Sequence, residues 1–178
     1  MDFALCVSVK DMDLSIIIPM FNEAENVEAT LSRVKGTLAP FNGTYEIIAV
    51  NDGSSDNTFE VLNKLAENNE RVRVVSYPKN IGRGMALRKG FKESSGEIIV
   101  SIDADLSYDP RYILHLVGAL RDEQDIDFVL ASPYMPGGSV ENVPFSRLWI
   151  SKLGNRILRF AMPNRIYTST GIFRAYRR

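Results

Sequence analysis

Five apolar runs alternate along the chain with four segments of helical periodicity. Each run is rich in β-branched residues and lacks polar alternation, which is typical of strands covered on both faces. Between the runs, apolar residues recur every three or four positions, as in helices with one buried face. The strand candidates are residues 14–19, 45–50, 72–77, 97–102 and 127–132, and the helix candidates are residues 24–38, 57–69, 84–94 and 110–123. This order predicts an α/β fold with a mostly parallel sheet and helices on both faces.

Length, charge and cysteine content narrow the class of protein. The 178 residues suffice for one domain. The 21 basic residues nearly balance the 22 acidic ones, and the resulting net charge of -1 does not favour a nucleic-acid partner. Cys6 is the only cysteine, which excludes an internal disulfide. With the single histidine, His115, it cannot build a zinc site. These features predict a reducing, cytoplasmic setting.

The two ends of the chain set the expected domain boundaries. Residues 1–13 hold a short apolar stretch with acidic flanks, which is neither a signal peptide nor a membrane span, and we interpret them as a leader. Residues 14–178 are then expected to form the domain. The chain stops on the helix- or strand-like phrase IFRAYRR without a capping residue, so we expect a domain truncated at its C-terminus.

Polar residues that need no structural role follow the first two strand candidates. In open α/β sheets, ligands bind beyond the carboxyl ends of the strands. Asn22 and Glu25 can form a capping box for the next helix, which leaves Glu23 free to accept hydrogen bonds from sugar hydroxyls. Asp52 precedes a turn at Gly53, and its carboxylate can accept the ring N–H of uracil or guanine or, alternatively, close an Asx-type turn.

A loop with two glycines follows the third strand candidate. Gly82 and Gly84 flank Arg83 just before a helix, which resembles a loop that cradles phosphate groups. A dinucleotide fingerprint would need a third glycine where Leu87 stands, and it would follow the first strand. The pattern therefore argues against a redox enzyme with a nicotinamide or flavin cofactor.

Asp103 and Asp105 follow the fourth strand candidate directly. Two carboxylates at this spacing can converge on one hard cation, and Mg²⁺ or Mn²⁺ favours oxygen ligands that it shares with substrate phosphates. A solvated acidic loop is the alternative. Because all the candidate loops fall at the same edge of one sheet, we favour a divalent metal site.

The last helical stretch, residues 144–162, is amphipathic in an unusual way. Phe145, Trp149, Leu153, Ile157 and Phe160 share one broad arc, and the border of that arc is basic, with Lys152, Arg156 and Arg159. This pattern suits a helix that lies in a membrane interface, with Trp and basic residues at the headgroup level. An ordinary helix packed on the domain is the alternative.

Four motifs in this order resemble those of the family 2 nucleotide-sugar glycosyltransferases, which have the GT-A fold: IIIPMFNEAEN, NDGSSDNT, NIGRGMALRKG and DADLSYDP. The tail PYMPGGSVENVPFSRLWISKLGNRIL resembles the polyprenyl-phosphate branch of that family, which includes the dolichyl-phosphate mannose synthases. The resemblance implies a base and ribose pocket, a donor-binding loop, a catalytic metal pair and an arginine for the acceptor phosphate. The implied residues are, in that order, Pro19, Phe21, Glu23 and Asp52, then Gly82 and Arg83, then Asp103 and Asp105, and finally Arg147.

The sequence departs from the mannose synthase pattern at three places. Asn51 stands where the family often has the first of two aspartates, and Ser107 stands where a glutamine can help to bind metal. Pro133 replaces the arginine of an S-R-Y motif, and the aspartate expected shortly before Gly171 is absent. One acceptor-binding arginine is therefore missing, while the donor-binding motifs are intact.

The resemblance implies a metal-dependent, inverting transfer of a hexose. The donor would be a GDP-mannose or UDP-glucose type of nucleotide sugar, and the acceptor a polyprenyl or dolichyl phosphate at the cytoplasmic face of a membrane. Four other interpretations stay open. Two concern nucleotide sugars: a family 2 enzyme with a polysaccharide or other glycan acceptor, and a non-catalytic scaffold that binds nucleotide sugars. The others are a haloacid-dehalogenase-type phosphatase with Asp103 as its nucleophile and a redox enzyme that would need nicotinamide or flavin.

Overall fold

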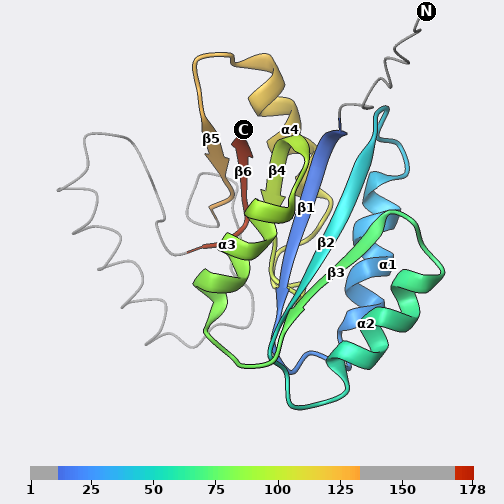
Figure 1. Cartoon of the computed structure of the whole chain (residues 1–178). Coiled ribbons are helices and arrows are strands. Elements are labelled where there is room, and N and C mark those ends of the chain that lie inside the picture. The colour runs from blue at the N-terminus through green and yellow to red at the C-terminus, as the bar shows by residue number, and fades with distance from the viewer. Residues whose placement is uncertain (1–11, 133–170) are drawn as a thin grey trace, which may run out of the picture.

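A computed structural model describes residues 12–132 and 171–178, which build one six-stranded sheet with the strand order β3-β2-β1-β4-β6-β5 (Figure 1). The four strands from β1 to β4 are parallel, because β1 pairs in parallel with both β2 and β4, and β2 pairs in parallel with β3. The strands are β1 (Met12–Met20), β2 (Tyr45–Asp52), β3 (Val72–Tyr77), β4 (Gly96–Ser101), β5 (Phe128–Leu130) and β6 (Arg174–Arg177).

The last strand lies inside the sheet. β6 pairs antiparallel with β4 on one side and with β5 on the other, so residues from the end of the chain separate two strands that are consecutive in the described sequence. The Ser101 hydroxyl donates to the Ile172 carbonyl and helps to hold this segment beside β4. The sequence predicted the strand near residues 127–132, but not the strand that comes between it and β4.

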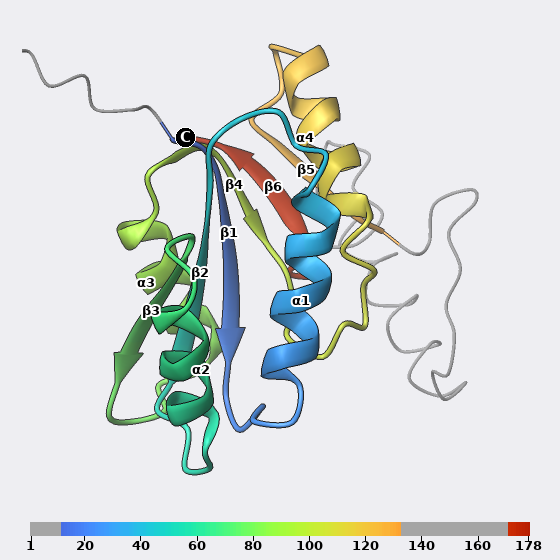
Figure 2. The same ribbon diagram turned by 90° about the vertical axis from the view of Figure 1, so that its right-hand side faces the viewer.

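Helices cover both faces of the sheet, as the sequence predicted. α1 (Val27–Leu38), α2 (Thr58–Glu67) and α4 (Tyr112–Asp122) pack on one face, and α3 (Arg83–Glu93) packs on the other. Figure 2 shows α1 and α4 on one side of the sheet and α3 on the opposite side. None of the helices in the described ranges is long and apolar enough to cross a membrane.

β1 is the centre of the hydrophobic core. From Leu14 to Met20 its residues are buried, and alternate side chains join two separate clusters. Ile16 and Ile18 face α1, α2 and α4, whereas Ile17 faces α3. α3 packs closely on β1, since a Cβ atom at Gly90 would lie 2.4 Å from the Ile17 side chain. A helix residue with a side chain at position 90 would push α3 away from the sheet.

Two buried carboxylates of β2 hold α3 at its two ends. Glu46, near the start of β2, accepts hydrogen bonds from the Ser95 N–H at 2.7 Å and from Arg73 Nη1 at 2.8 Å. Asp52, at the end of β2, accepts from the Gly82 N–H at 3.0 Å, just before α3 begins. The ends of α3 are therefore fixed relative to the sheet through charge-assisted hydrogen bonds.

The strand order reverses beside β1. The chain proceeds from β1 to β2 and β3 in one direction, and then returns to place β4 on the other side of β1. β1 and β4 therefore end side by side at the point where the strand order reverses, which is where open α/β sheets bind their ligands. The predicted site residues follow these strands.

Candidate functional site

The loop after β1 is tied to the loop after β2. The Asn22 N–H donates to Ser54 Oγ at 3.0 Å, and Asn22 Oδ1 accepts from the Ser55 N–H at 2.8 Å. The Glu23 N–H donates to Thr58 Oγ1 at 2.9 Å. Asn22 has a left-handed backbone, with φ of 56°, which turns its side chain toward the neighbouring loop.

These contacts correct the capping box predicted for Asn22 and Glu25. Asn26 is the N-cap residue of α1, and no side chain caps the helix there. The Asn26 side chain instead donates to Glu23 Oε2 at 2.6 Å. Asn22 thus joins two loops at the carboxyl edge, and Glu23 is half-buried at the start of the first one.

The loop after β3 packs on the loop after β2. Gly53 has φ of +61°, and a Cβ atom there would lie 2.4 Å from the backbone N of Asn80. Asp52 is only 2% exposed, and its carboxylate accepts hydrogen bonds from the Ile81 N–H at 2.9 Å and the Gly82 N–H at 3.0 Å. Asp52 therefore holds the glycine-containing loop, and any contact with a nucleotide base stays a prediction.

The conformation of Gly82 sets the start of α3. Its φ of 102° lies in a region that L residues rarely adopt, and it is the N-cap residue of α3. Arg83, the first helical residue, then points toward the end of β4, where its Nη1 lies 3.5 Å from Asp103 Oδ1. The structure thus brings together the glycine-containing loop and the predicted metal pair.

Asp103 and Asp105 lie in a strongly negative environment. The Asp103 side chain is 21% exposed, and burial raises the pKa of its carboxyl group. The Asp105 carboxylate raises this pKa further, Arg83 opposes the shift, and Glu23 adds a smaller repulsion. Asp105 is exposed, and its Oδ1 accepts the Ser107 N–H at 2.9 Å. Glu23, Arg83, Asp103 and Asp105 therefore share one electrostatic environment at the reversal of strand order.

Asp109 follows in the same loop but is neutralised separately. It forms ion pairs with Arg111 at 2.7 Å and with Arg33 at 3.2 Å. The side chain and backbone N–H of Arg111 hold the pKa of the Asp109 carboxyl below its usual range. Asp109 thus stabilises the loop, whereas Arg83 is the one arginine in the described ranges that pairs with Asp103.

The two carboxylates fit a divalent cation that is shared with a substrate. In the described part of the chain, no three histidine, cysteine or acidic residues are grouped so that they could hold a metal ion by themselves. Mg²⁺ is usually held by only one or two carboxylates together with substrate phosphates and waters. Burial and then the Asp105 carboxylate raise the pKa of Asp103, and a bound cation would favour the ionised form of this carboxyl group.

The remaining predicted residues lie at the edge of this site or outside the described ranges. Pro19 is buried in register with Val50, and Phe21 is 44% exposed after the end of β1. Their roles toward a base or ribose stay predictions. Arg147, the helix predicted within residues 144–162, and Pro133 all lie outside the described residues.

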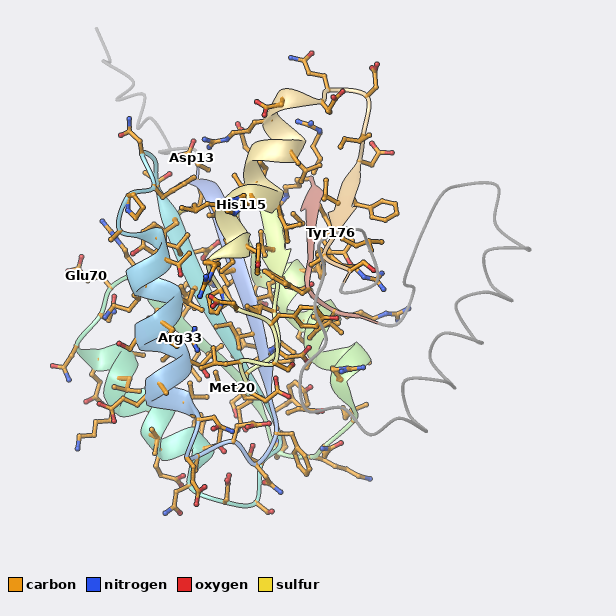
Figure 3. All side chains as sticks on the ribbon, turned by 180° about the vertical axis from the view of Figure 1, so that it is seen from behind. Asp13, Met20, Arg33, Glu70, His115 and Tyr176 are labelled. Atoms are coloured by element: carbon orange, nitrogen blue, oxygen red, sulfur yellow. The ribbon has the colours of Figure 1, made fainter. Side chains whose placement is uncertain are left out.

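His115, the single histidine of the chain, lies on α4. It is exposed on α4, with its Nδ1 3.3 Å from the Arg111 carbonyl oxygen. Figure 3 shows it well away from Met20, which marks the carboxyl end of β1. It therefore lies apart from the carboxyl edge where the candidate residues gather.

Sequence reasoning missed Tyr77 and noted Asn51 only as a departure from the family pattern. Asn51 is 3% exposed; its side-chain amide donates to Ser76 Oγ at 2.9 Å and its oxygen accepts the Ser54 N–H at 3.2 Å. The amide group thus uses both its donor and its acceptor, which suits asparagine at this position. Tyr77 stands beside Asp52 in the register of β2 and β3, and this pairing depends on the strand order and not on a local pattern in the sequence.

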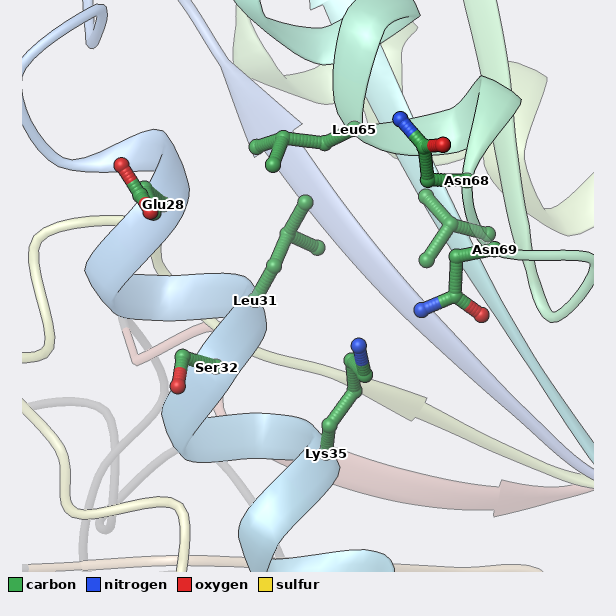
Figure 4. A pocket seen from close by; sticks show the side chains of 8 residues that line it. Glu28, Leu31, Ser32, Lys35, Leu65, Asn68 and Asn69 are labelled. Carbon is green, nitrogen blue, oxygen red and sulfur yellow. The ribbon is translucent and has the colours of Figure 1, made fainter.

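A surface hollow of about 280 Å³ lies elsewhere, between α1 and α2. Leu31 and Lys35 of α1 face Leu65 and Asn68 across it (Figure 4). Val72, at the start of β3, also lines it, so the hollow opens away from the carboxyl ends of the strands. It is not the candidate site.

Comparison with known proteins identifies the family. Residues 15–178 match the family described as glycosyl transferase family 2, and the chain belongs to that family. It is 41% identical over 152 residues to the dolichol-phosphate mannosyltransferase of Pyrococcus furiosus, covering 85% of this chain and 42% of the relative. It is 34% identical over 167 residues to the polyprenol monophosphomannose synthase of Mycolicibacterium smegmatis, covering 92% of this chain and 61% of the relative. The chain thus spans about half the length of these curated relatives.

A solved structure supports the predicted fold. The glucosyl-3-phosphoglycerate synthase of Mycobacterium tuberculosis, solved with Mn²⁺, uridine diphosphate and glucosyl-3-phosphoglycerate, superposes with a TM-score of 0.64 at 25% identity. The superposition covers 93% of this chain and 57% of that one. The predicted GT-A fold and the resemblance to the polyprenyl-phosphate branch are confirmed. The domain boundaries at residues 13 and 14 stay a prediction.

Proposed function

We propose that this chain carries the catalytic site of an inverting glycosyltransferase that moves a hexose from a nucleotide-diphosphate sugar to a polyprenyl or dolichyl phosphate. The names of the two curated relatives support this acceptor class. The observation that carries the proposal is the convergence of Asp103, Asp105 and Arg83 at the reversal of strand order. The protein would work at the cytoplasmic face of a membrane.

Asp103 and Asp105 would hold Mg²⁺ or Mn²⁺ together with the donor diphosphate. A divalent ion at this place neutralises the negative charge that develops on a leaving diphosphate. Manganese in the related synthase structure supports a divalent metal. Arg83, at the start of α3, would lie along the same phosphates and orient them, and the left-handed Gly82 would keep the loop clear of a side chain there.

The other end of the donor would lie against the loops after β1 and β2. Glu23 would accept hydrogen bonds from the ribose hydroxyls, and Pro19 and Phe21 would line the base. The partial exposure of the Phe21 ring supports its availability for such a contact. Asp52 would accept a ring N–H of uracil or guanine, for which its carboxylate has unused acceptor capacity.

The acceptor phosphate would attack the anomeric carbon from the face opposite the diphosphate. A new bond forms between a phosphate oxygen and that carbon, the bond from the carbon to the diphosphate oxygen breaks, and the configuration inverts. Because the acceptor is already an anion near neutral pH, no strong general base is needed. The position of His115 away from the site agrees with this. We propose Arg147 as the partner of the acceptor phosphate, and residues 144–162 as the membrane contact.

A two-stage experiment tests the proposal. Calorimetry with UDP- and GDP-sugars in the presence of Mn²⁺ first identifies the donor, and a short polyprenyl phosphate is then added to measure transfer and release of nucleoside diphosphate. Transfer to a soluble glycan instead would move the chain to another acceptor class. Donor binding without any release of nucleoside diphosphate would indicate a scaffold, and a phosphorylated enzyme intermediate would indicate a phosphatase.

A further inference from the structure

The Tyr77 hydroxyl is buried in the candidate site without a hydrogen-bond partner among the described residues. Tyr77 ends β3, and its ring packs on the α3 side of the sheet against the cluster that contains Val50 and Ala86. Most buried polar atoms in folded proteins have a partner, so an unpaired hydroxyl at this place needs an explanation. The explanation lies with its neighbour on β2.

Asp52 is the residue paired with Tyr77 in the register of the two parallel strands. Adjacent strands are about 4.8 Å apart, so paired side chains on one face are direct neighbours. Burial raises the pKa of the Tyr77 hydroxyl, and the Asp52 carboxylate raises it further, which keeps the hydroxyl protonated and able to donate. Tyr77 can therefore offer a proton to Asp52, and Asp52 can only accept.

The hydrogen bonds of Asp52 can be counted. An ionised carboxylate has about four acceptor sites, two on each oxygen. The Ile81 N–H donates to Oδ1 at 2.9 Å, and the Gly82 N–H donates mainly to Oδ2 at 3.0 Å. A hydroxyl from Tyr77 would fill a third site. One acceptor site of the Asp52 carboxylate is then left for a fourth donor. The other three hydrogen bonds prevent the carboxylate from rotating.

We propose that Tyr77 is a positioning residue for base recognition. Its O–H, with the two backbone N–H groups, fixes the Asp52 carboxylate so that one acceptor site faces the ring N–H of the donor's base. This inference rests on the proposed function and adds a determinant of base specificity to it. Uracil and guanine carry such a ring N–H, whereas the corresponding ring nitrogen of cytosine is an acceptor and would meet the carboxylate unfavourably.

The test is a comparison of bases in Tyr77→Phe, which keeps the ring and removes only the hydroxyl. Binding of UDP, GDP and CDP is measured by calorimetry with Mn²⁺ present. UDP or GDP, whichever the parent binds more tightly, is compared with CDP. We expect the ratio of these two affinities to fall about tenfold, as for the loss of one hydrogen bond to a charged group. Affinity for CDP should hardly change. Tyr112→Phe, at an exposed position of α4, is the matched control and should keep the parent preference.

A double-mutant cycle separates positioning from packing. If Tyr77 acts through Asp52, Tyr77→Phe should not change the base preference further in an Asp52→Ala background. Equal weakening of all three nucleotides, or a parent-like preference in folded Tyr77→Phe, would overturn the inference. Should Tyr77→Phe not fold, Tyr77→Met, whose flexible apolar side chain fills a similar space, is measured in its place.

The proposed function has its own readout in Asp52→Asn. An amide can donate to the cytosine ring nitrogen, so this variant should shift the preference toward CDP if Asp52 contacts the base. If the base preference shifts in Asp52→Asn but does not change in Tyr77→Phe, the proposed function stands and the positioning role of Tyr77 is wrong. If the parent protein binds UDP, GDP and CDP equally, both the contact of Asp52 with the base and the positioning role of Tyr77 are contradicted.

Discussion

Arg83 Nη1 lies 3.5 Å from Asp103 Oδ1, across the reversal of strand order between β1 and β4. The arginine comes from the start of α3 and the aspartate from the loop just after β4, so the contact joins the helix on one face to the carboxyl edge of the sheet. The Arg83 side chain is 59% exposed, so solvent screens its attraction to Asp103. Arg83 can therefore leave Asp103 at little cost when another cation or a phosphate arrives.

The first prediction concerns the metal pair. Asp105→Asn removes one charged ligand, and we expect donor affinity in the presence of Mn²⁺ to fall about tenfold or more, since the ion bridges the protein and the diphosphate. Calorimetry with the preferred nucleotide sugar measures this. Asp122→Asn, in the last turn of α4, is the control for a lost surface carboxylate. Donor affinity that is unchanged in excess EDTA would rule out the metal site.

The second prediction follows from the pairing of Arg83 with Asp103. Arg83→Gln removes a cation that competes for Asp103, so free Mn²⁺ should bind a few-fold more tightly without nucleotide, in line with the roughly 0.2–1 kcal/mol of an exposed pair. Nucleoside diphosphate should bind less tightly, because a phosphate contact is lost. Electron paramagnetic resonance of free Mn²⁺ measures the first effect.

Arg88→Gln, one turn and a half further along α3 and exposed, is the matched control for this change of charge. It should leave both affinities near those of the parent. Weaker binding of free Mn²⁺ in Arg83→Gln would show that the guanidinium supports the carboxylates and does not compete with the ion.

The third prediction concerns stability at low pH. Asp13 Oδ2 accepts the Thr44 N–H at 2.6 Å and the Thr44 hydroxyl at 2.8 Å, and these bonds lower the pKa of Asp13. Because the folded pKa lies below the unfolded value, the stabilisation is present above the unfolded pKa of about 3.9 and is lost as the pH falls through the folded pKa. Asp13→Asn should therefore lose about 1 kcal/mol at pH 7 and less at pH 3.

Urea unfolding of the parent and Asp13→Asn at several pH values measures this difference. Asp127→Asn, just before β5, is the control, because the structure gives its side chain no such pair of donors in the described residues. A loss of stability that is the same at pH 3 and pH 7 would show that Asp13 acts through packing and not through its charge.

Local patterns predicted most of the sheet but not the order of its last strands. The runs 45–50 and 72–77 became β2 (Tyr45–Asp52) and β3 (Val72–Tyr77), because a continuous apolar run can be buried only between two layers. β6 (Arg174–Arg177) is short and lies between β4 and β5 through long-range antiparallel pairing. Nothing in its own four residues specifies the partner strands.

The candidate site was predictable to a similar degree. The spacing of Asp103 and Asp105 after an apolar run placed them at the carboxyl edge, since parallel strands end together. The contact between Arg83 and Asp103, and the neighbouring places of Asp52 and Tyr77, depend on strand order and register. Asn22 was misread as part of a capping box because its left-handed backbone is a tertiary feature.

The fourth prediction concerns the membrane. If the apolar arc of residues 144–162 rests on a bilayer, changing Phe145 and Trp149 to serine together should reduce binding to anionic liposomes, because burial of the two rings supplies the apolar part of the affinity. Co-sedimentation with vesicles measures this. Phe59→Ser, at an exposed position of α2, is the control for a lost surface ring. Liposome binding that the double change leaves intact would favour a helix packed on the domain.

The last prediction concerns the acceptor. With Pro133 in place of one arginine, Arg147 is the remaining candidate to bind the lipid phosphate, because its planar guanidinium can donate paired hydrogen bonds to phosphate oxygens. Arg147→Ala should leave nucleotide-sugar affinity nearly intact while transfer to a short polyprenyl phosphate falls by about tenfold or more, on the order of 1.4 kcal/mol. Arg121→Ala, in the last turn of α4, should change neither value. Loss of donor binding in Arg147→Ala would instead assign this arginine to the donor, and unchanged transfer would remove it from the site.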